Sequence, residues 1–554
     1  MRALVFSDCF GWIHEAPGDC GVVLCGAQGF EQFCAHAGWR KLAADIAAQG
    51  FPVLRFDYHG AGDSLGTDED PDRLATWQAN VADAVATLRR ETGITRVVLV
   101  GLRLGALLAM DYAAKTGDVD GLVLLAPVPT GRSYTREISA FARMADSKPA
   151  EAGEIEMMGF RLTAETIAAL KDFRPAAVAR PLARRLLILT QGPRGTILDE
   201  AQQAGAEITE EAFPGYTEFL AEPSGPIPEG AFQRVVTWLG TCETGTVAKS
   251  GATVPPSTFA TATFAEEPIL FGPDGSLFGM LCQPASGPCA EVMLLVNAGN
   301  NPHIGWARSN VRIARDLAAR GIASFRIDVA GIGDSPAQAG RPAQIPFSAA
   351  NVGDVEAALD VLQARGLTQI TIAGSCSGAH LALQSVRRDP RVGAVVLINL
   401  FSYIWLESND LRALTRAAGR STAAYASRFK SRETWLRLLR GDLDLRQLSR
   451  TFAARIRHAV AVRLAPLNPK SHVRQIRSWF DDLAARQIGV LFVFSEGDNS
   501  LDMFNSNLGE KRLRRNPRAR TAMLHGADHH LTDRKSQDRL ADLLVGMTAS
   551  NDRN

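Results

Sequence analysis

Three features are scarce in this 554-residue sequence, and each scarcity excludes a class of protein. The 60 lysines and arginines almost balance the 59 aspartates and glutamates, so a net charge of +1 gives no reason to expect nucleic-acid binding. No apolar run approaches the roughly 18–20 residues that a membrane-spanning helix needs. Residues 1–20 also lack the apolar core of a signal peptide. We therefore expect a cytoplasmic protein without a membrane span.

Cysteine is the third scarce feature. The eight cysteines form no CxxC pair and no Cys/His group with zinc spacing, so neither a metal site nor a redox motif is expected. In a chain of this length they are typical of reduced cytosolic thiols. No glycine-rich phosphate-binding loop is present, and the sequence predicts no cofactor.

What the sequence does contain is an internal repeat. Residues 50–64 are GFPVLRFDYHGAGDS, and residues 321–335 are GIASFRIDVAGIGDS. Between the copies, residues 241–265 are rich in Thr, Ser, Ala, Gly and Pro, which is typical of a linker. The sequence therefore predicts two domains, 1–240 and 266–554, with the boundary near residue 255. The positions that recur in register are Arg55, Asp57, Gly60, Gly62, Asp63 and Ser64, which return as Arg326, Asp328, Gly331, Gly333, Asp334 and Ser335.

Short apolar segments alternate with helical segments in both copies. Continuous apolar strands separated by helices favour a mostly parallel sheet covered by helices on both faces. Ligands of such sheets bind at the carboxyl ends of the strands. In the second copy the predicted strands are 292–296, 323–327, 369–373, 394–398, 489–494 and 521–524.

The strongest chemical motif is GSCSG at residues 374–378, between a predicted strand and a predicted helix. A tight turn of this kind lifts its central residue above the sheet at a helix N-terminus. The partial positive charge at that N-terminus favours the thiolate form of Cys376. The sequence therefore predicts Cys376 as a nucleophile, the alternative being a buried cysteine in a Gly/Ser loop.

An acid and a base follow Cys376 in the chain order expected of a catalytic triad. Asp498 comes just after the strand predicted at 489–494, with Asp502 and Glu496 as alternatives. His529 follows the last predicted strand, with His530 as the alternative base.

An oxyanion hole needs two backbone N–H groups aimed at the developing negative charge. We expect one from Ser377, directly after the nucleophile. The other should come from the loop after the strand at 292–296, and Ala298 is favoured there.

The first copy keeps the elbow without this chemistry. Residues 101–105 are GLRLG, and Arg103 stands at the nucleophile position. Tyr216 stands at the histidine position, and residues 191–194 contain no carboxylate. A guanidinium cannot attack a carbonyl, so the first domain is predicted to be catalytically silent.

At these residues both copies resemble the α/β-hydrolase superfamily. Residues 297–299, 305–308 and 326–335 look like the predicted hydrolases associated with bacterial exosortase systems, which implies a role near surface-polymer biosynthesis. The cysteine elbow is similar to that of dienelactone hydrolases and polyhydroxyalkanoate synthases. The expected fold is therefore α/β, with two tandem α/β-hydrolase domains and a helical lid inserted in the second.

The lid is predicted at about residues 401–485. This segment carries 16 Lys/Arg against 7 Asp/Glu, together with Trp405, Trp435 and Trp479. One interpretation is a cationic mouth for an acylated small molecule, an acyl-CoA or an acyl carrier protein. The other is a solvated face of amphipathic helices.

Two functions follow from these patterns. The first is an acyl-transfer enzyme, a thioesterase, esterase or acyltransferase that forms a covalent acyl-enzyme on Cys376. The second is a non-catalytic double module that binds an acyl ligand or a partner.

Overall fold

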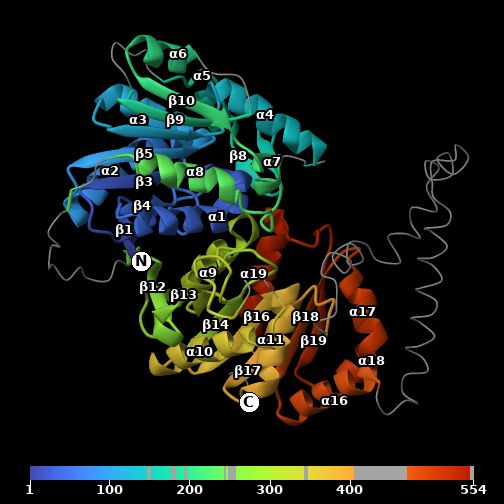
Figure 1. The fold of residues 1–554 in the computed structure, drawn as a ribbon. Helices are drawn as coiled ribbons and strands as arrows, with labels where there is room; N and C mark the ends of the chain where they lie inside the picture. The colour runs from blue at the N-terminus through green and yellow to red at the C-terminus, as the bar shows by residue number, and fades with distance from the viewer. Residues whose placement is uncertain are drawn as a thin grey trace, which may run out of the picture. The chain divides into compact units, whose positions relative to one another are not determined.

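Each half of the chain builds its own mostly parallel sheet (Figure 1). The computed structural model describes residues 1–145, 147, 151–175, 182–191, 196–242, 245–246, 258–341, 347–404 and 471–548. The contacts divide the chain into two units, residues 1–260 with 265–268, and residues 261–264 with 269–554. Arg194, Trp405, Trp435 and most of the predicted lid lie outside the described residues.

Unit one contains an eight-stranded sheet in the order β1-β2-β4-β3-β5-β6-β9-β10. The pairings β1–β2 and β2–β4 are antiparallel, and the other pairings are parallel. The strands are β1 Arg2–Phe6, β2 Cys9–His14, β3 Cys20–Cys25, β4 Val53–Phe56, β5 Arg96–Leu102, β6 Gly121–Leu125, β9 Arg185–Thr190 and β10 Glu207–Ala212, with a separate hairpin of β7 Ile155–Met157 and β8 Phe160–Leu162. The helices are α1 Gly29–Ala48, α2 Arg73–Thr92, α3 Leu104–Thr116, α4 Gly131–Met144, α5 Ala164–Asp172, α6 Thr196–Gln203, α7 Tyr216–Phe219 and α8 Glu229–Leu239.

A second sheet, of nine strands, repeats this order as β11-β12-β13-β15-β14-β16-β17-β18-β19. Its strands from β14 to β19 pair in parallel, and β13 pairs antiparallel with β15. The strands are β11 Phe259–Ala260, β12 Phe264–Phe271, β13 Leu277–Pro284, β14 Glu291–Val296, β15 Ala323–Asp328, β16 Gln369–Ser375, β17 Val392–Ile398, β18 Gly489–Ser495 and β19 Ala519–Leu524. The helices are α9 Ser309–Ala319, α10 Asn351–Ala364, α11 Ser377–Arg388, α16 His472–Ala485, α17 Asn499–Asn507, α18 Glu510–Leu513 and α19 Arg534–Thr548.

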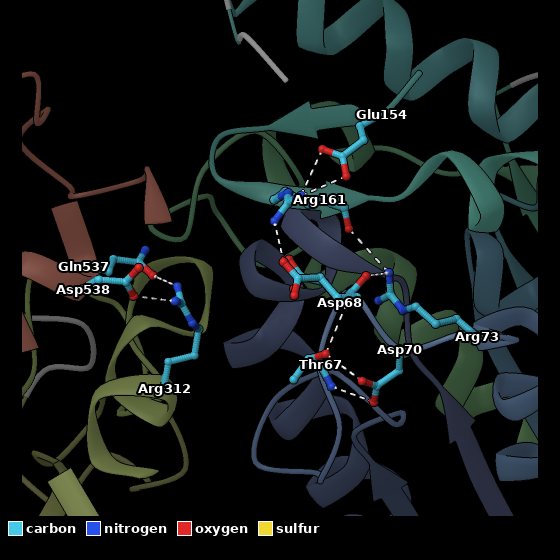
Figure 2. A network of polar contacts seen from close by, with 10 residues as sticks. Thr67, Asp68, Asp70, Arg73, Glu154, Arg161, Arg312, Gln537 and Asp538 are labelled. Carbon is cyan, nitrogen blue, oxygen red and sulfur yellow. Dashed lines mark hydrogen bonds and ion pairs between the residues drawn. The ribbon is translucent and has the colours of Figure 1, made fainter. Parts of the chain in front are cut away.

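The central strands of each sheet are buried on both sides, because helices cover both faces. In unit one, α2 and α3 pack on one face, and α1 and α8 pack on the other. In unit two, α10, α11 and α16 pack on one face, and α9 and α19 on the other. Arg312 of α9 donates to Gln537 and Asp538 of α19, which joins these two helices (Figure 2). The predicted α/β fold with mostly parallel sheets is confirmed. Within the described residues, every helix is too short or too polar to span a membrane.

The repeated R-x-D…G-x-G-D-S motif fastens the turn after one strand of each sheet. In unit two, the Asp328 carboxylate accepts hydrogen bonds from the Asp334 N–H at 2.8 Å and from Asn297 Nδ2 at 2.8 Å. It also accepts from His303, from the backbone N–H and from ring Nδ1, both at 2.7 Å. In unit one, Asp57 likewise accepts from the Asp63 N–H at 3.0 Å and from Gln32 Nε2 at 2.9 Å.

His303, Asp328 and Asp334 are close enough to suggest a metal site, since one ligand atom from each falls within 4.8 Å of the others. The Asp328 oxygens, however, already accept four hydrogen bonds within the protein. We therefore assign this buried group to stabilisation of the fold.

Gly333 is the position where this turn tolerates least change. Its φ is +54°, and a Cβ there would lie 2.2 Å from Asp328 Oδ2. We expect Gly333→Ala to lower the free energy of unfolding by about 2–4 kcal/mol, from left-handed strain plus the clash. Gly366→Ala is the matched control, because Gly366 has φ +77° but open space around it. Urea unfolding followed by circular dichroism measures both variants, and equal losses would contradict the clash.

Candidate active site

Cys376 lies in the turn between β16 and α11, in a strained backbone conformation with φ 57° and ψ −116°. Neighbouring backbone packs too closely for larger residues on either side. A Cβ at Gly374 would lie 2.3 Å from the Gly378 carbonyl, and a Cβ at Gly378 would lie 2.3 Å from the Asn297 oxygen. The two glycines of the motif are therefore required by close approach, and they raise Cys376 above the sheet edge.

The structure brings the three predicted catalytic side chains together. His529 Nδ1 hydrogen-bonds to Asp498 Oδ2 at 2.6 Å. The Cys376 side chain lies close enough to the same imidazole to raise its pKa. Asp498 is buried, and its other oxygen accepts from the Ser500 N–H at 2.8 Å, which caps α17. The acid is thus anchored by a helix start while it orients the base.

The charged groups at this site shift one another's pKa values. Burial alone would lower the pKa of His529, but the hydrogen bonds to Asp498 and Cys376 and their negative charges raise it to about 10. Burial would raise the pKa of Asp498, but the hydrogen bond and positive charge of His529 hold it below its usual range. An imidazolium at neutral pH is what a paired thiolate requires.

His530 plays a different part from its neighbour. Its ring stacks on Trp306, with centroids 4.3 Å apart and planes at 17°. Burial, followed by the positive charge of His529, lowers the pKa of His530 to about 4. His530 is therefore neutral near pH 7, and the geometry favours His529 as the base.

The alternative acids, Glu496 and Asp502, have other surroundings. Glu496 accepts a hydrogen bond from the Gly526 N–H at 2.8 Å, and Asp502 lies inside α17. Of the three acids considered, Asp498 makes the hydrogen bond to His529.

The predicted oxyanion loop packs against the start of α11. The Gly299 N–H donates to Ser377 Oγ at 2.7 Å, so the loop that carries Ala298 is fastened beside the elbow. Ser377 is the first residue of α11, and its N–H has no acceptor within the helix. The Cys376 N–H is used differently, since it donates to the Ile398 oxygen at 2.9 Å. Ala298 and Ser377 remain the predicted donors.

In unit one the same turn carries an ion pair. Arg103 has φ 54° and ψ −117°, almost the angles of Cys376. Its Nε donates to Glu31 of α1 at 2.8 Å, and its Nη2 donates to Glu137 of α4 at 2.6 Å. The guanidinium also lies over the Tyr216 ring, 5.7 Å from the centroid. Although burial opposes its charge, these carboxylates hold the pKa of Arg103 above its usual range.

In unit one, ion pairs hold the segment after β6 at two places. Glu137 of α4 holds Arg103. On β8, Arg161 donates to Glu69 at 3.1 Å. Arg161 also donates to Glu154 at 2.8 Å (Figure 2). Sequence reasoning found Arg103 and Tyr216 but missed Glu31 and Glu137, which are 72 and 34 residues from Arg103. The sequence marks these two residues only as acidic residues on helices. That feature is too common to identify them as partners of Arg103.

Comparisons with known proteins concern each unit separately. The family described as serine aminopeptidase, S33, matches residues 29–209, and the alpha/beta hydrolase family matches residues 293–543. No curated protein matches the chain.

Similar solved structures include three hydrolases. Est1E from Butyrivibrio proteoclasticus, bound to ferulic acid, is 15% identical, with 43% of this chain and 98% of that chain covered and a TM-score of 0.30. The dienelactone hydrolase of Anabaena variabilis is 13% identical, with 53% and 98% covered and a TM-score of 0.31. A serine hydrolase from Cycloclasticus zankles is 17% identical, with 52% and 100% covered and a TM-score of 0.32.

The charge coupling gives a test that needs no substrate. We expect Cys376→Ala to lower the pKa of His529 from about 10, because the hydrogen bond and charge of the cysteine both raise it. The direction follows because a lost anionic partner destabilises the imidazolium. Side-chain NMR titration of His529 measures the shift. An unchanged midpoint would show that Cys376 does not pair with this imidazole.

The ion pair of unit one gives a second test that needs no substrate. We expect Arg103→Met to lower the free energy of unfolding by about 3–5 kcal/mol, because Glu31 would be left buried without its partner. Adding Glu31→Gln should restore part of that loss, which denaturant unfolding measures. A loss that the second change does not reduce would contradict the pairing.

Proposed function

Because the chain carries two α/β-hydrolase domains in tandem, we propose that unit two is an acyl-transfer enzyme with a Cys376–His529–Asp498 triad. The observation that carries the proposal is the hydrogen bond between His529 and Asp498, with Cys376 close enough to the same imidazole to raise its pKa. This is the arrangement by which a base activates a nucleophile while an acid orients the base.

The proposed reaction begins with a thiolate–imidazolium pair. The Cys376 sulfur bonds to the carbonyl carbon of an ester or thioester, and the carbonyl electrons move onto oxygen. In this proposal the N–H groups of Ala298 and Ser377 stabilise this oxyanion. The tetrahedral intermediate then expels the alcohol or thiol, which takes the proton from His529 and leaves a thioester on Cys376.

Release of the acyl group completes the cycle. His529, now neutral, accepts a proton from water or from an acceptor hydroxyl, whose oxygen attacks the thioester carbon. The carbon–sulfur bond breaks, the thiolate returns, and the proton stays on His529. A thioester intermediate suits onward transfer of the acyl group as well as hydrolysis.

The substrate class is proposed from the sequence. The excess of basic residues at 401–485 favours an anionic acyl donor, such as an acyl-CoA or an acyl carrier protein. The resemblance to exosortase-associated hydrolases suggests a setting in surface-polymer biosynthesis.

Unit one supports the second proposed function, a non-catalytic module. An arginine paired with two carboxylates fills its nucleophile position. The side chain is 6% exposed, so it offers neither a nucleophile nor an open site. We propose that this unit serves packing or substrate presentation.

Kinetics on an activated thioester test the triad. We expect Cys376→Ala and His529→Ala each to lower kcat by about a thousandfold or more, and the double variant to lose little more, because such residues act as one unit. Asp498→Asn should cost less, since a thiolate–imidazolium pair depends less on its orienting acid.

The control is His530→Ala, which should change kcat within a few-fold because His530 packs on Trp306. If His530→Ala abolished turnover while His529→Ala spared it, the assignment of the base would be wrong. If no variant changed turnover, the triad assignment would be wrong, and an absence of any turnover would favour the non-catalytic function for both units.

A further inference from the structure

Asn399 links two loops that sequence reasoning treated separately. It follows β17 directly, in a left-handed conformation with φ 50°, and its exposed fraction is 0%. Its Oδ1 accepts from the Ser495 N–H at 2.8 Å. Its Nδ2 donates to Ser495 Oγ at 2.9 Å and to the His529 carbonyl at 3.1 Å. One amide therefore contacts both β18 and the loop after β19.

These contacts lie beside the triad. Ser495 ends β18, three residues before Asp498, and its Oγ donates to the Asp528 carbonyl at 2.7 Å. The backbone of the base and the strand that carries the acid are thus held by the same pair of side chains. The Asp498–His529 distance of 2.6 Å depends on both backbones staying in place.

Unit one supplies a natural comparison at the equivalent position. Ala126 follows β6 with φ 43°, and its N–H donates to the Leu189 oxygen at 2.7 Å. The Asn399 N–H makes the matching hydrogen bond to the Val493 oxygen at 2.9 Å. The backbone is the same, but the amide is absent in the unit that carries Tyr216 in place of a histidine. Alanine therefore fits this backbone, and the turn does not need asparagine to form.

We propose that Asn399 is a positioning residue that holds the acid and base of the triad in hydrogen-bonding register. The inference rests on the proposed function. The physical reason is that loops on separate strands relax independently unless a buried group joins them. Asparagine suits this place because it tolerates a left-handed backbone and offers both a donor and an acceptor.

The test compares Asn399→Ala and Asn399→Gly in the full chain. Glycine removes the amide and also relieves any left-handed strain, so an effect shared by both variants belongs to the amide. The readout is the rate of Cys376 alkylation by iodoacetamide against pH, read by peptide mapping. Cys242 and Cys289 serve as internal references, because burial raises the pKa of each.

We expect both variants to slow the alkylation of Cys376 at neutral pH relative to the wild-type chain. A weaker Asp498–His529 hydrogen bond lowers the pKa of His529. The imidazolium that stabilises the thiolate then loses its proton at a lower pH. The side chains that face His529, namely Asp498, Cys376 and His530, remain unchanged in both variants. On a thioester substrate, kcat should fall about tenfold with KM little changed.

Asn516→Ala is the matched control. Asn516 is also buried, its Nδ2 donates to the Ile488 oxygen at 2.9 Å, and its Oδ1 accepts from the Arg518 N–H at 3.0 Å, at the start of β19. This variant should lower stability without moving the alkylation profile. A wild-type profile in both Asn399 variants would overturn the inference. Alkylation needs no substrate, so an absence of turnover would count against the proposed function and leave this test intact.

Discussion

The close packing of the elbow against the loop after the first parallel strand is the constraint on which both units depend. Gly378 approaches the Asn297 oxygen in unit two, and Gly105 approaches the Cys25 oxygen in unit one, so neither position has room for a Cβ. This contact forces the central residue into a left-handed conformation whatever its side chain. Cys376 and Arg103 consequently have nearly the same backbone angles despite opposite chemistry. The fold thus supplies a raised position, and the side chain decides what it can do.

The side chains around the two elbows solve opposite electrostatic problems. A buried guanidinium needs carboxylates, and Glu31 and Glu137 supply them from helices on either side of Arg103. A thiolate would need a cation, and the proposed pairing with His529 would supply one. In unit one the charges have a structural role, because Arg103 is paired with both carboxylates. In unit two the proposed pairing would leave a nucleophile at the edge of the sheet.

Support for the triad comes from residues that take no part in the chemistry. Trp306 stacks on the ring of His530, so His530 does not take the role that we propose for His529. Asn399 and Ser495 join the strand ends that carry the acid and the base. Asn399 and Ser495 are buried, so their contacts can fix an orientation that exposed loops would not keep. The reactive geometry is therefore a property of several loops held together.

The sequence by itself determined the repeat, the mostly parallel sheet and the candidates Cys376, Asp498 and His529. It could do so because apolar runs and glycine spacing are local signals, and because the carboxyl ends of parallel strands meet at one edge. It also showed that Arg103 replaces the nucleophile in unit one. Only the tertiary structure decided that His529, and not His530, contacts Asp498, because adjacent residues point in different directions once packed. It alone identified Glu31, Glu137 and Asn399, whose partners lie between 34 and 130 residues away along the chain. Contacts of that range depend on how the strands and helices pack, and no local pattern records them.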